Sequence, residues 1–333
     1  MIVRDEEHSL DTVLSGSRPY VEQIVVVDTG SKDKTLEIAS QYADVIEHFT
    51  WIEDFSAARN FSLRFADQPW ILVLDADEFI DEENFNLIRS RISSANEFDG
   101  YYLWQHLYSD NIDGSEPSWK PASKGAIHNR GKRGYSENKI VRLFKNNKGI
   151  NYCGRIHEIV DESIAENALS DSGAIIHHHH DDPKNQTRKH VLRNLEIQEA
   201  LIKNENATAR DFLSAGAGHL RTTQDFDRAA GYFKSALSMG APPDDTIEAI
   251  AETAYRAGRL EEAYHLYRQL YESGAGSSAV LNNLSNLLVK TGDLNGAAAL
   301  LQELLDRGVD DDVRKARIEQ NLVVLREAIN ERE

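Results

Sequence analysis

The chain has 333 residues, a formal net charge of −18 and a hydrophobic fraction of 41%. This length suits two domains with separate cores, and the acidic balance argues against broad nucleic-acid binding, which needs a basic face. No apolar run approaches the ~18 residues of a membrane helix, and the single cysteine, Cys153, excludes an internal disulfide. We therefore expect a cytoplasmic protein without a membrane span.

Two continuous apolar runs, Ile24–Val27 and Ile71–Leu74, predict buried parallel strands of an α/β domain. Residues 35–43 between them have helical spacing, so the whole segment predicts a βαβ unit. An acidic residue follows each strand directly, Asp28 after the first and Asp75 after the second. Because open α/β sheets bind ligands beyond the carboxyl ends of their strands, we expect these acids to share one edge of a sheet.

Asp75 and Asp77 form a D-x-D pair, which an extended backbone points in one direction. Two carboxylates aimed together repel unless a cation lies beside them. Mg²⁺ or Mn²⁺, held by one or two carboxylates and by substrate phosphate oxygens, suits that geometry. The pair predicts a divalent-metal site, and the alternative is a pair of surface acids.

A segment rich in Gly, Ser and Pro at residues 115–136 predicts a long loop. It carries a local basic cluster, which is either a solvated surface or a lid on a phosphorylated ligand. The cluster consists of Lys120, Lys124, Arg130, Lys132 and Arg133.

The segments MIVRDEE, IVVVDTGSKDKT, FSAARNFSL and WILVLDADE follow one another in an order that resembles the family-2 glycosyltransferases of the GT-A fold. The resemblance covers roughly residues 1–180 and is closest to a branch similar to bacterial β-glucosyltransferases of surface glycans and peptide S-glycosyltransferases. It implies a metal-assisted transferase that moves a sugar from a UDP-sugar donor, with inversion. One departure is the first strand, which the family begins several residues earlier than Met1.

The resemblance also implies roles for individual residues. Asp77 would bind the metal, which neutralises the diphosphate leaving group. Asp28 would read the nucleobase, and Asp75 would reach the ribose or, through water, the metal. The full set of nucleotide-sugar contacts is Val3, Arg4, Asp28, Arg59, Asn60 and Asp75.

The acceptor side follows the basic loop. An alternating strand pattern at residues 140–144 leads to the sequence GRIHE, which resembles a family element, and Glu158 is the candidate base for the acceptor proton. A salt bridge from Glu158 to Arg142 or Arg155 is the alternative. In the internal run of four histidines, the resemblance matches His177, with His178 as the alternative, to a histidine that can complete the metal site, and His157 is the rival ligand.

The second half of the chain is a helical repeat. Ala229, Ala263 and Ala297 stand 34 residues apart, with bulky apolar residues four positions after each. This period and pattern resemble the tetratricopeptide repeat (TPR). Gly258 and Gly292 fall five residues before their alanines, where a turn is expected, whereas the first repeat has Gln224.

We therefore predict an α/β domain of GT-A type at 1–182, a connecting helix at 183–204 and an all-α, TPR-like domain with a capping helix at 205–333. The function predicted is glycosyl transfer to a hydroxyl or thiol of a glycan, peptide or protein, and the TPR domain would bind a protein partner. Two other classes remain open: a non-catalytic nucleotide-binding scaffold, and a nucleotidyltransferase, which usually opens with a glycine-rich basic loop that MIVRDEEHS lacks.

Overall fold

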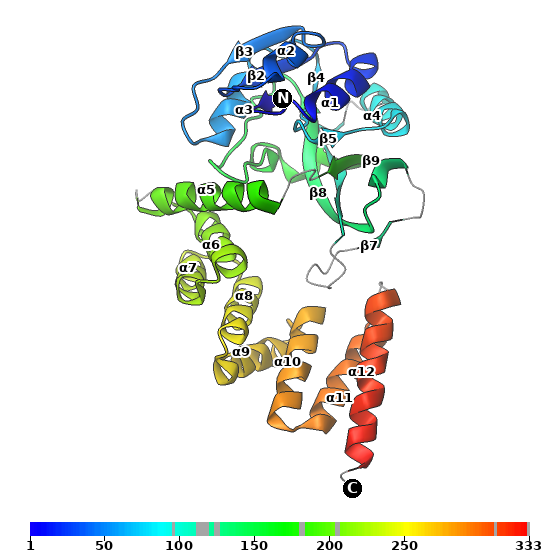
Figure 1. Ribbon diagram of the computed structural model, residues 1–333, viewed down its shortest axis with the longest axis vertical. Helices are drawn as coiled ribbons and strands as arrows, with labels where there is room; N and C mark the ends of the chain where they lie inside the picture. The colour runs from blue at the N-terminus through cyan, green and yellow to red at the C-terminus, as the bar shows by residue number, and fades with distance from the viewer. Residues whose placement is uncertain are drawn as a thin grey trace. The chain divides into compact units, whose positions relative to one another are not determined.

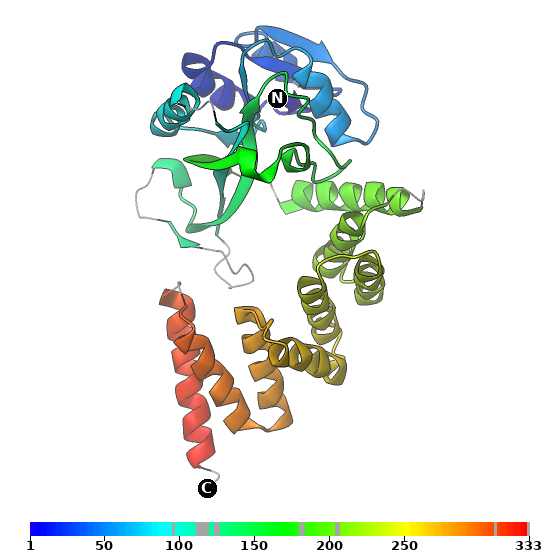
Figure 2. The same ribbon diagram turned by 180° about the vertical axis from the view of Figure 1, so that it is seen from behind.

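The computed structural model describes residues 1–94, 97–110, 120–122, 127–179, 184–203, 207–309 and 312–331. The chain divides into two compact units, Met1–Asp181 and Asp182–Glu333. The predicted three-part division stays a prediction, although the helix at Lys184–Lys203 (α5) falls within the second unit. Figures 1 and 2 show the two units from opposite sides.

The N-terminal unit is an α/β domain that contains two sheets. Its strands are β1 (Ile2–Val3), β2 (Val25–Asp28), β3 (Val45–His48), β4 (Trp70–Leu72), β5 (Glu78–Phe79), β6 (Gly100–Ser109), β7 (Lys120–Pro121), β8 (Gly134–Lys145) and β9 (Leu169–His179). Its α-helices are α1 (Leu10–Ser17), α2 (Thr35–Ala39), α3 (Phe55–Leu63) and α4 (Glu82–Ser94). Short 3₁₀ turns are η1 (Arg18–Tyr20), η2 (Ile127–Asn129), η3 (Asp161–Ser163) and η4 (Glu166–Ala168).

The topology corrects one prediction. Strands β1, β2 and β3 form a parallel sheet, whereas β4 pairs antiparallel with β8 in a second sheet of order β4-β8-β6-β9-β5. The parallel unit is therefore β2-α2-β3, and the two apolar runs do not pair with each other. Helix α2 is also shorter than the predicted 35–43, ending at Ala39.

Strand β1 has only two residues, and it lies at one edge of the parallel sheet among the described strands. A pocket of about 590 Å³ lies behind it, with Met1, Val25 and Ile71 among its lining residues. Its walls thus include the starts of β2 and β4.

The core of the unit follows the strand pattern. Val26 and Val27 of β2 are fully buried, as are Leu103 of β6 and Ile176 of β9. Such continuous apolar strands are expected where both faces of a sheet are covered. The buried strands hold the loops at their carboxyl ends in place, where the acidic residues lie.

The C-terminal unit is all helical. After α5 come α6 (Ala209–Gly218), a π-helical turn η5 (His219–Thr223), α7 (Phe226–Ser238), α8 (Pro243–Arg256), α9 (Leu260–Glu272), α10 (Ser278–Thr291), α11 (Leu294–Asp306) and α12 (Asp312–Asn330). Each of these α-helices packs against the next one along the chain (Figure 1). That arrangement is the one expected of helical repeats.

The repeat positions have the predicted burial. Ala229, Ala263 and Ala297 are completely buried, and the bulky residues that follow, Phe233 and Tyr267, are at most 2% exposed. A small residue at each alanine position allows the paired helices to approach closely, so that the larger side chain fills the space between neighbouring pairs.

Among the described residues, no helix is both long and apolar enough to cross a membrane.

Candidate active site

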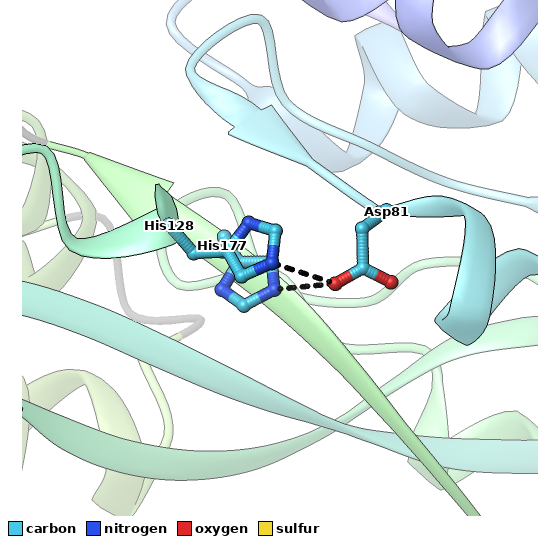
Figure 3. Close-up of side chains that lie close together, drawn as sticks. All are labelled: Asp81, His128 and His177. Atoms are coloured by element: carbon cyan, nitrogen blue, oxygen red, sulfur yellow. Dashed lines mark hydrogen bonds and ion pairs between the residues drawn. The ribbon is translucent and has the colours of Figure 1, made fainter. Parts of the chain in front are cut away.

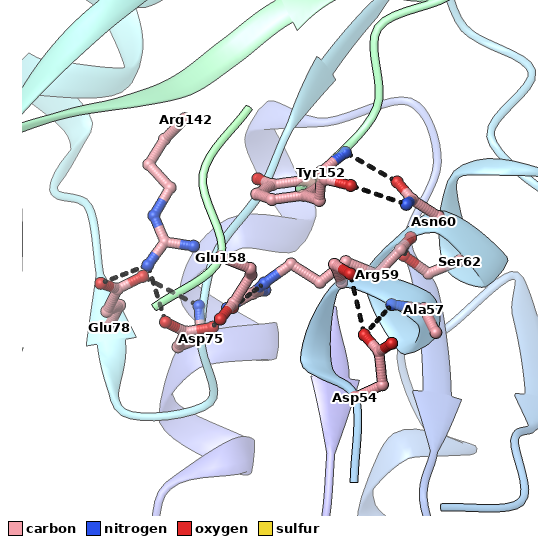
Figure 4. Close-up of polar contacts among 11 residues, drawn as sticks. Asp54, Ala57, Arg59, Asn60, Ser62, Asp75, Glu78, Arg142, Tyr152 and Glu158 are labelled. Carbon is pink, nitrogen blue, oxygen red and sulfur yellow. Dashed lines mark hydrogen bonds and ion pairs between the residues drawn. The ribbon is translucent and has the colours of Figure 1, made fainter. Parts of the chain in front are cut away.

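A buried arginine lies at the centre of the candidate site. Arg59, in α3, is 5% exposed and donates from Nη2 to Oδ1 of Asp75 and from Nε to Oε1 of Glu158, both at 2.6 Å (Figure 4). Helix α3 begins after Asp54, whose carboxylate accepts a hydrogen bond from the amide of Ala57 at 2.8 Å. This N-cap fixes the first turn of the helix that carries Arg59.

A second buried arginine completes the network around Asp75. Arg142 of β8 donates from Nη2 to Oδ2 of Asp75 at 2.7 Å and approaches Oε1 of Glu78 at 3.3 Å. Burial opposes ionisation of Asp75, but Arg142 and Arg59 together hold the pKa of Asp75 well below its usual range. Burial raises the pKa of Glu78, whose carboxylate also accepts hydrogen bonds from Gln105 and from the amide of Asp75.

The chain segment that carries Glu158 is held against α3. Asn60 donates from Nδ2 to the carbonyl of Tyr152 at 3.0 Å and accepts from the amide of Tyr152 at 2.8 Å. Cys153 and Ile159 then form an antiparallel bridge that folds the segment back. Asn60 therefore positions the turn that bears Glu158, a contact that its predicted role at the donor did not include.

The predicted salt-bridge partners of Glu158 were wrong. Glu158 pairs with Arg59, whereas Arg142 pairs with Asp75 and Arg155 lies 3.6 Å from Asp54. Glu158 accepts its bond through Oε1, and within the described part of the chain its other oxygen receives none. One carboxylate oxygen is thus fixed, and the other remains able to accept a proton.

Asp77 has a different partner from Asp75, a histidine rather than an arginine. Its side chain is 37% exposed, and Oδ2 is 2.9 Å from Nε2 of His178 in β9. Although burial opposes it, the hydrogen bond to Asp77 raises the pKa of His178. Of the two acids in the D-x-D pair, Asp77 is the one without a bound arginine among the described residues.

The predicted metal ligand His177 lies elsewhere. Side chains alternate along a strand, so His177 and His178 leave β9 on opposite faces. His177 stacks on Phe79 and lies 3.3 Å from Asp81 rather than beside Asp77. The structure therefore brings His178, not His177, to the D-x-D pair. The rival ligand His157 is exposed, with a backbone φ of 53°.

The predicted nucleotide contacts lie at the end of the parallel sheet. Val3 and Asp28 are paired neighbours on β1 and β2, each 3% exposed. The carboxylate of Asp28 accepts the amides of Gly30 at 3.1 Å and Ser31 at 3.0 Å, which shapes the loop after β2. Arg4 follows β1 and is exposed. The pair at Val3 and Asp28 is where the resemblance puts the nucleobase.

Sequence reasoning missed Glu6, whose carboxylate lies near other acidic side chains of the site. It lies in the loop after β1, where its amide donates to Thr35 Oγ1 at 2.7 Å. Burial, and then the charges of Asp77, Asp75 and Asp33, raise its pKa to about 7. The motif MIVRDEE contained this residue, but nothing in its spacing indicated burial.

The structure also shows the surroundings of the single cysteine and of the basic segment. Cys153 is exposed. In the basic segment, Lys132 contacts Asp110 at 3.3 Å and Lys120 contacts Glu137 at 2.6 Å, while Lys124 lies outside the described residues. These two lysines therefore already face carboxylates of the domain.

Both units of the chain are similar to known protein families. Residues 5–161 match the model of glycosyl transferase family 2, and residues 254–318 match a tetratricopeptide repeat model. A TPR repeat-containing protein of Synechococcus elongatus is 27% identical over 88% of this chain and 71% of its own length. The glycosyltransferase SunS of Bacillus subtilis is 23% identical over 72% of this chain, which spans about half (52%) of SunS.

Other similarities are more limited. A lipopolysaccharide core biosynthesis glycosyltransferase, LpsC of Rhizobium meliloti, is 28% identical over 26% of this chain and 33% of its own length. The solved structure of MamA covers 44% of this chain and 83% of its own length at 10% identity, with a TM-score of 0.38. The chain therefore carries a glycosyltransferase family 2 domain in its N-terminal unit and tetratricopeptide repeats in its C-terminal unit, and these matches support its assignment as a glycosyltransferase.

Proposed function

We propose that this enzyme transfers a hexose from a UDP-sugar to a hydroxyl or thiol acceptor, with inversion in a single displacement. The observation that carries the proposal is the double contact of Arg59, which joins Asp75 on the donor side to Glu158 on the acceptor side. A network of this kind holds two functional carboxylates in one geometry before substrates bind, and such preorganisation is what catalysis requires.

The donor would lie along the carboxyl ends of β1 and β2. In this proposal Asp28 and Val3 contact the base, and Arg4 contacts the base and ribose. Asp75, oriented by Arg59 and Arg142, faces the ribose. Asn60 supports the site indirectly, because it fixes the segment at Tyr152.

Asp77 and His178 fit a divalent metal. Their Oδ2 and Nε2 atoms are 2.9 Å apart, and neighbouring ligands of an octahedral ion with bonds of 2.0–2.1 Å are about 2.9 Å apart. Mn²⁺ or Mg²⁺ bound there would neutralise charge on the departing diphosphate. Metal binding needs the lone pair of His178, so it would release the proton that this imidazole shares with Asp77.

Glu158 would act as the base. As the acceptor oxygen or sulfur attacks the anomeric carbon, the bond from that carbon to the UDP oxygen breaks, and Glu158 takes the acceptor proton. The fixed contact to Arg59 leaves Oε2 for this task. The acceptor would be a surface glycan, a peptide or a protein in the cytoplasm, and the tetratricopeptide repeats would hold a polypeptide partner.

Ligand-dependent melting tests the donor site. UDP with Mn²⁺ should raise the melting temperature, because a ligand that binds only the folded state stabilises it. Asp77→Ala should remove that rise. No shift in the wild type would support a non-catalytic scaffold instead.

Product analysis tests the chemistry. The enzyme should release UDP slowly from UDP-glucose when Mn²⁺ is present, and a panel of nucleotide sugars should identify the donor. Glu158→Gln should lower turnover by about 10²–10⁴-fold while the melting shift with UDP is retained. Pyrophosphate release from UTP and a sugar phosphate would instead identify a nucleotidyltransferase.

A further inference from the structure

A second group of metal-ligating side chains lies away from Asp77 and His178. Asp81 follows β5, His128 lies in η2, and His177 lies in β9 (Figure 3). One oxygen or nitrogen from each residue lies within 4.8 Å of the other two. Three segments that are distant in the sequence thus bring two imidazoles and one carboxylate together.

The distances in this group fit a tetrahedral ion. Oδ2 of Asp81 is 3.3 Å from Nε2 of His128 and 3.3 Å from Nε2 of His177. Zinc bonds to nitrogen and oxygen are about 2.0–2.1 Å long, so two ligands of a tetrahedral zinc are about 3.3 Å apart. The separation at Asp77 and His178 is 2.9 Å, so the two groups differ in spacing as well as in composition.

Hydrogen bonds from neighbouring residues orient the ligand atoms of His177 and Asp81. Tyr108 Oη is 2.8 Å from Nδ1 of His177, and this contact leaves Nε2 directed toward Asp81. Asn84 donates to Oδ1 of Asp81 from both its amide nitrogen and Nδ2, each at 2.8 Å, which leaves Oδ2 directed toward the histidines. Metal-binding histidines and carboxylates typically have such partners.

One of the two imidazoles is buried and the other can be reached from solvent. His177 is 4% exposed, whereas the side chain of His128 is 38% exposed. A ligand group of this kind is held by the domain on one side and leaves an approach for an ion on the other.

We propose that Asp81, His128 and His177 form a zinc site, with a water molecule as the fourth ligand. Two histidines, one carboxylate and an open position form a ligand set that zinc favours. The ion would tie η2 to β9 and to the turn after β5. This site is independent of the proposed donor metal, since the two groups share no residue and His177 and His178 lie on opposite faces of β9.

Titration of the metal-free full-length protein with Zn²⁺ alone tests the site. The wild type should bind zinc, and His128→Ala and Asp81→Asn should each weaken binding by more than about 100-fold, because even the loss of an outer-shell partner costs 10–100-fold. His128 is 38% exposed, so its replacement should not unfold the domain. His8→Ala is the matched control, since His8 is 94% exposed and lies outside the group.

Co²⁺ provides a second readout that reports geometry. The wild type and His8→Ala should give the visible absorption of tetrahedral Co²⁺, and His128→Ala should not. Asp77→Ala should keep both Zn²⁺ binding and this absorption, even though it should lose the response to UDP and Mn²⁺. Unchanged Zn²⁺ affinity in His128→Ala, or a wild type that binds no Zn²⁺, would overturn the proposal whatever the outcome at the donor site.

Discussion

Arg59 donates from Nη2 to Oδ1 of Asp75 at 2.6 Å, and both side chains lie within the N-terminal unit at the candidate active site. The same guanidinium holds Glu158, which is 99 positions further along the chain. Because Arg59 is 5% exposed, its charge is compensated by these carboxylates rather than by water. The stability of the domain and the geometry of its site therefore depend on the same contacts.

Arg59→Met should destabilise the domain strongly. Removing one member of a buried ion pair leaves uncompensated charge and costs about 3–5 kcal/mol. Denaturant unfolding measures the loss, and Arg64→Met, at an exposed position just after α3, is the matched control. A loss below about 1 kcal/mol, the value of an exposed pair, would show that the network does not stabilise the fold.

His178→Ala should weaken the Mn²⁺-dependent binding of UDP at least about tenfold, as expected when a metal site loses a ligand or its partner. The reason is the contact of 2.9 Å between His178 and Asp77. Calorimetric titration of UDP with and without Mn²⁺ measures the effect, and His128→Ala is the control. The reverse pattern, with His128→Ala defective and His178→Ala normal, would place the donor metal at the group around His177.

These histidines show what the sequence could not determine. The run of four histidines in the sequence does not reveal its register, although three of them, His177 to His179, end β9. A shift of one residue moves a side chain to the other face of a strand. The contact of 2.9 Å between Nε2 of His178 and Oδ2 of Asp77 settles which histidine faces Asp77. Strand pairing between distant segments is information that local spacing does not contain.

The same limit explains the error at β4. The apolar run Ile71–Leu74 predicted a buried strand, and it was assigned as a parallel partner of β2, whereas its partner is β8, antiparallel. The repeats were predictable because each helix contacts its sequence neighbours, so a period of one structural unit appears directly in the sequence. Asp75 and Asp77 are identified by type and spacing. Arg59 and Arg142 are also named from the sequence, but in other roles, so their contacts with Asp75 are not predicted.

Glu6→Gln should change how stability depends on pH. The pKa of Glu6 is raised from 4.5 to about 7 in the folded protein, so the folded state keeps a proton that the unfolded state has released. Wild-type stability should therefore fall between about pH 4.5 and pH 7 through this group. Glu6→Gln should lack that decrease. The free energy of unfolding of the variant minus that of the wild type should therefore be larger at pH 8 than at pH 5.

Chemical denaturation at the two pH values measures this difference. Glu22→Gln is the control, since the side chain of Glu22 is 68% exposed and contacts Arg89 at the surface. If the difference between Glu6→Gln and the wild type is the same at both pH values, Glu6 is not protonated preferentially in the folded state.

Gln224→Gly should stabilise the C-terminal unit. Gln224 replaces the turn glycine of the first repeat, yet it adopts a φ of 56°, in the same left-handed region as Gly258 at 76° and Gly292 at 89°. That conformation costs a residue with a side chain about 1 kcal/mol, a cost that glycine does not have. Because Gln224 is exposed, its side chain has little packing to lose.

Thermal unfolding should show a gain of about 0.5–1 kcal/mol for Gln224→Gly. The matched change Gln269→Gly, at an exposed position inside α9, should cost about 1 kcal/mol. A loss at both positions would mean that the left-handed turn is not the source of strain in the first repeat.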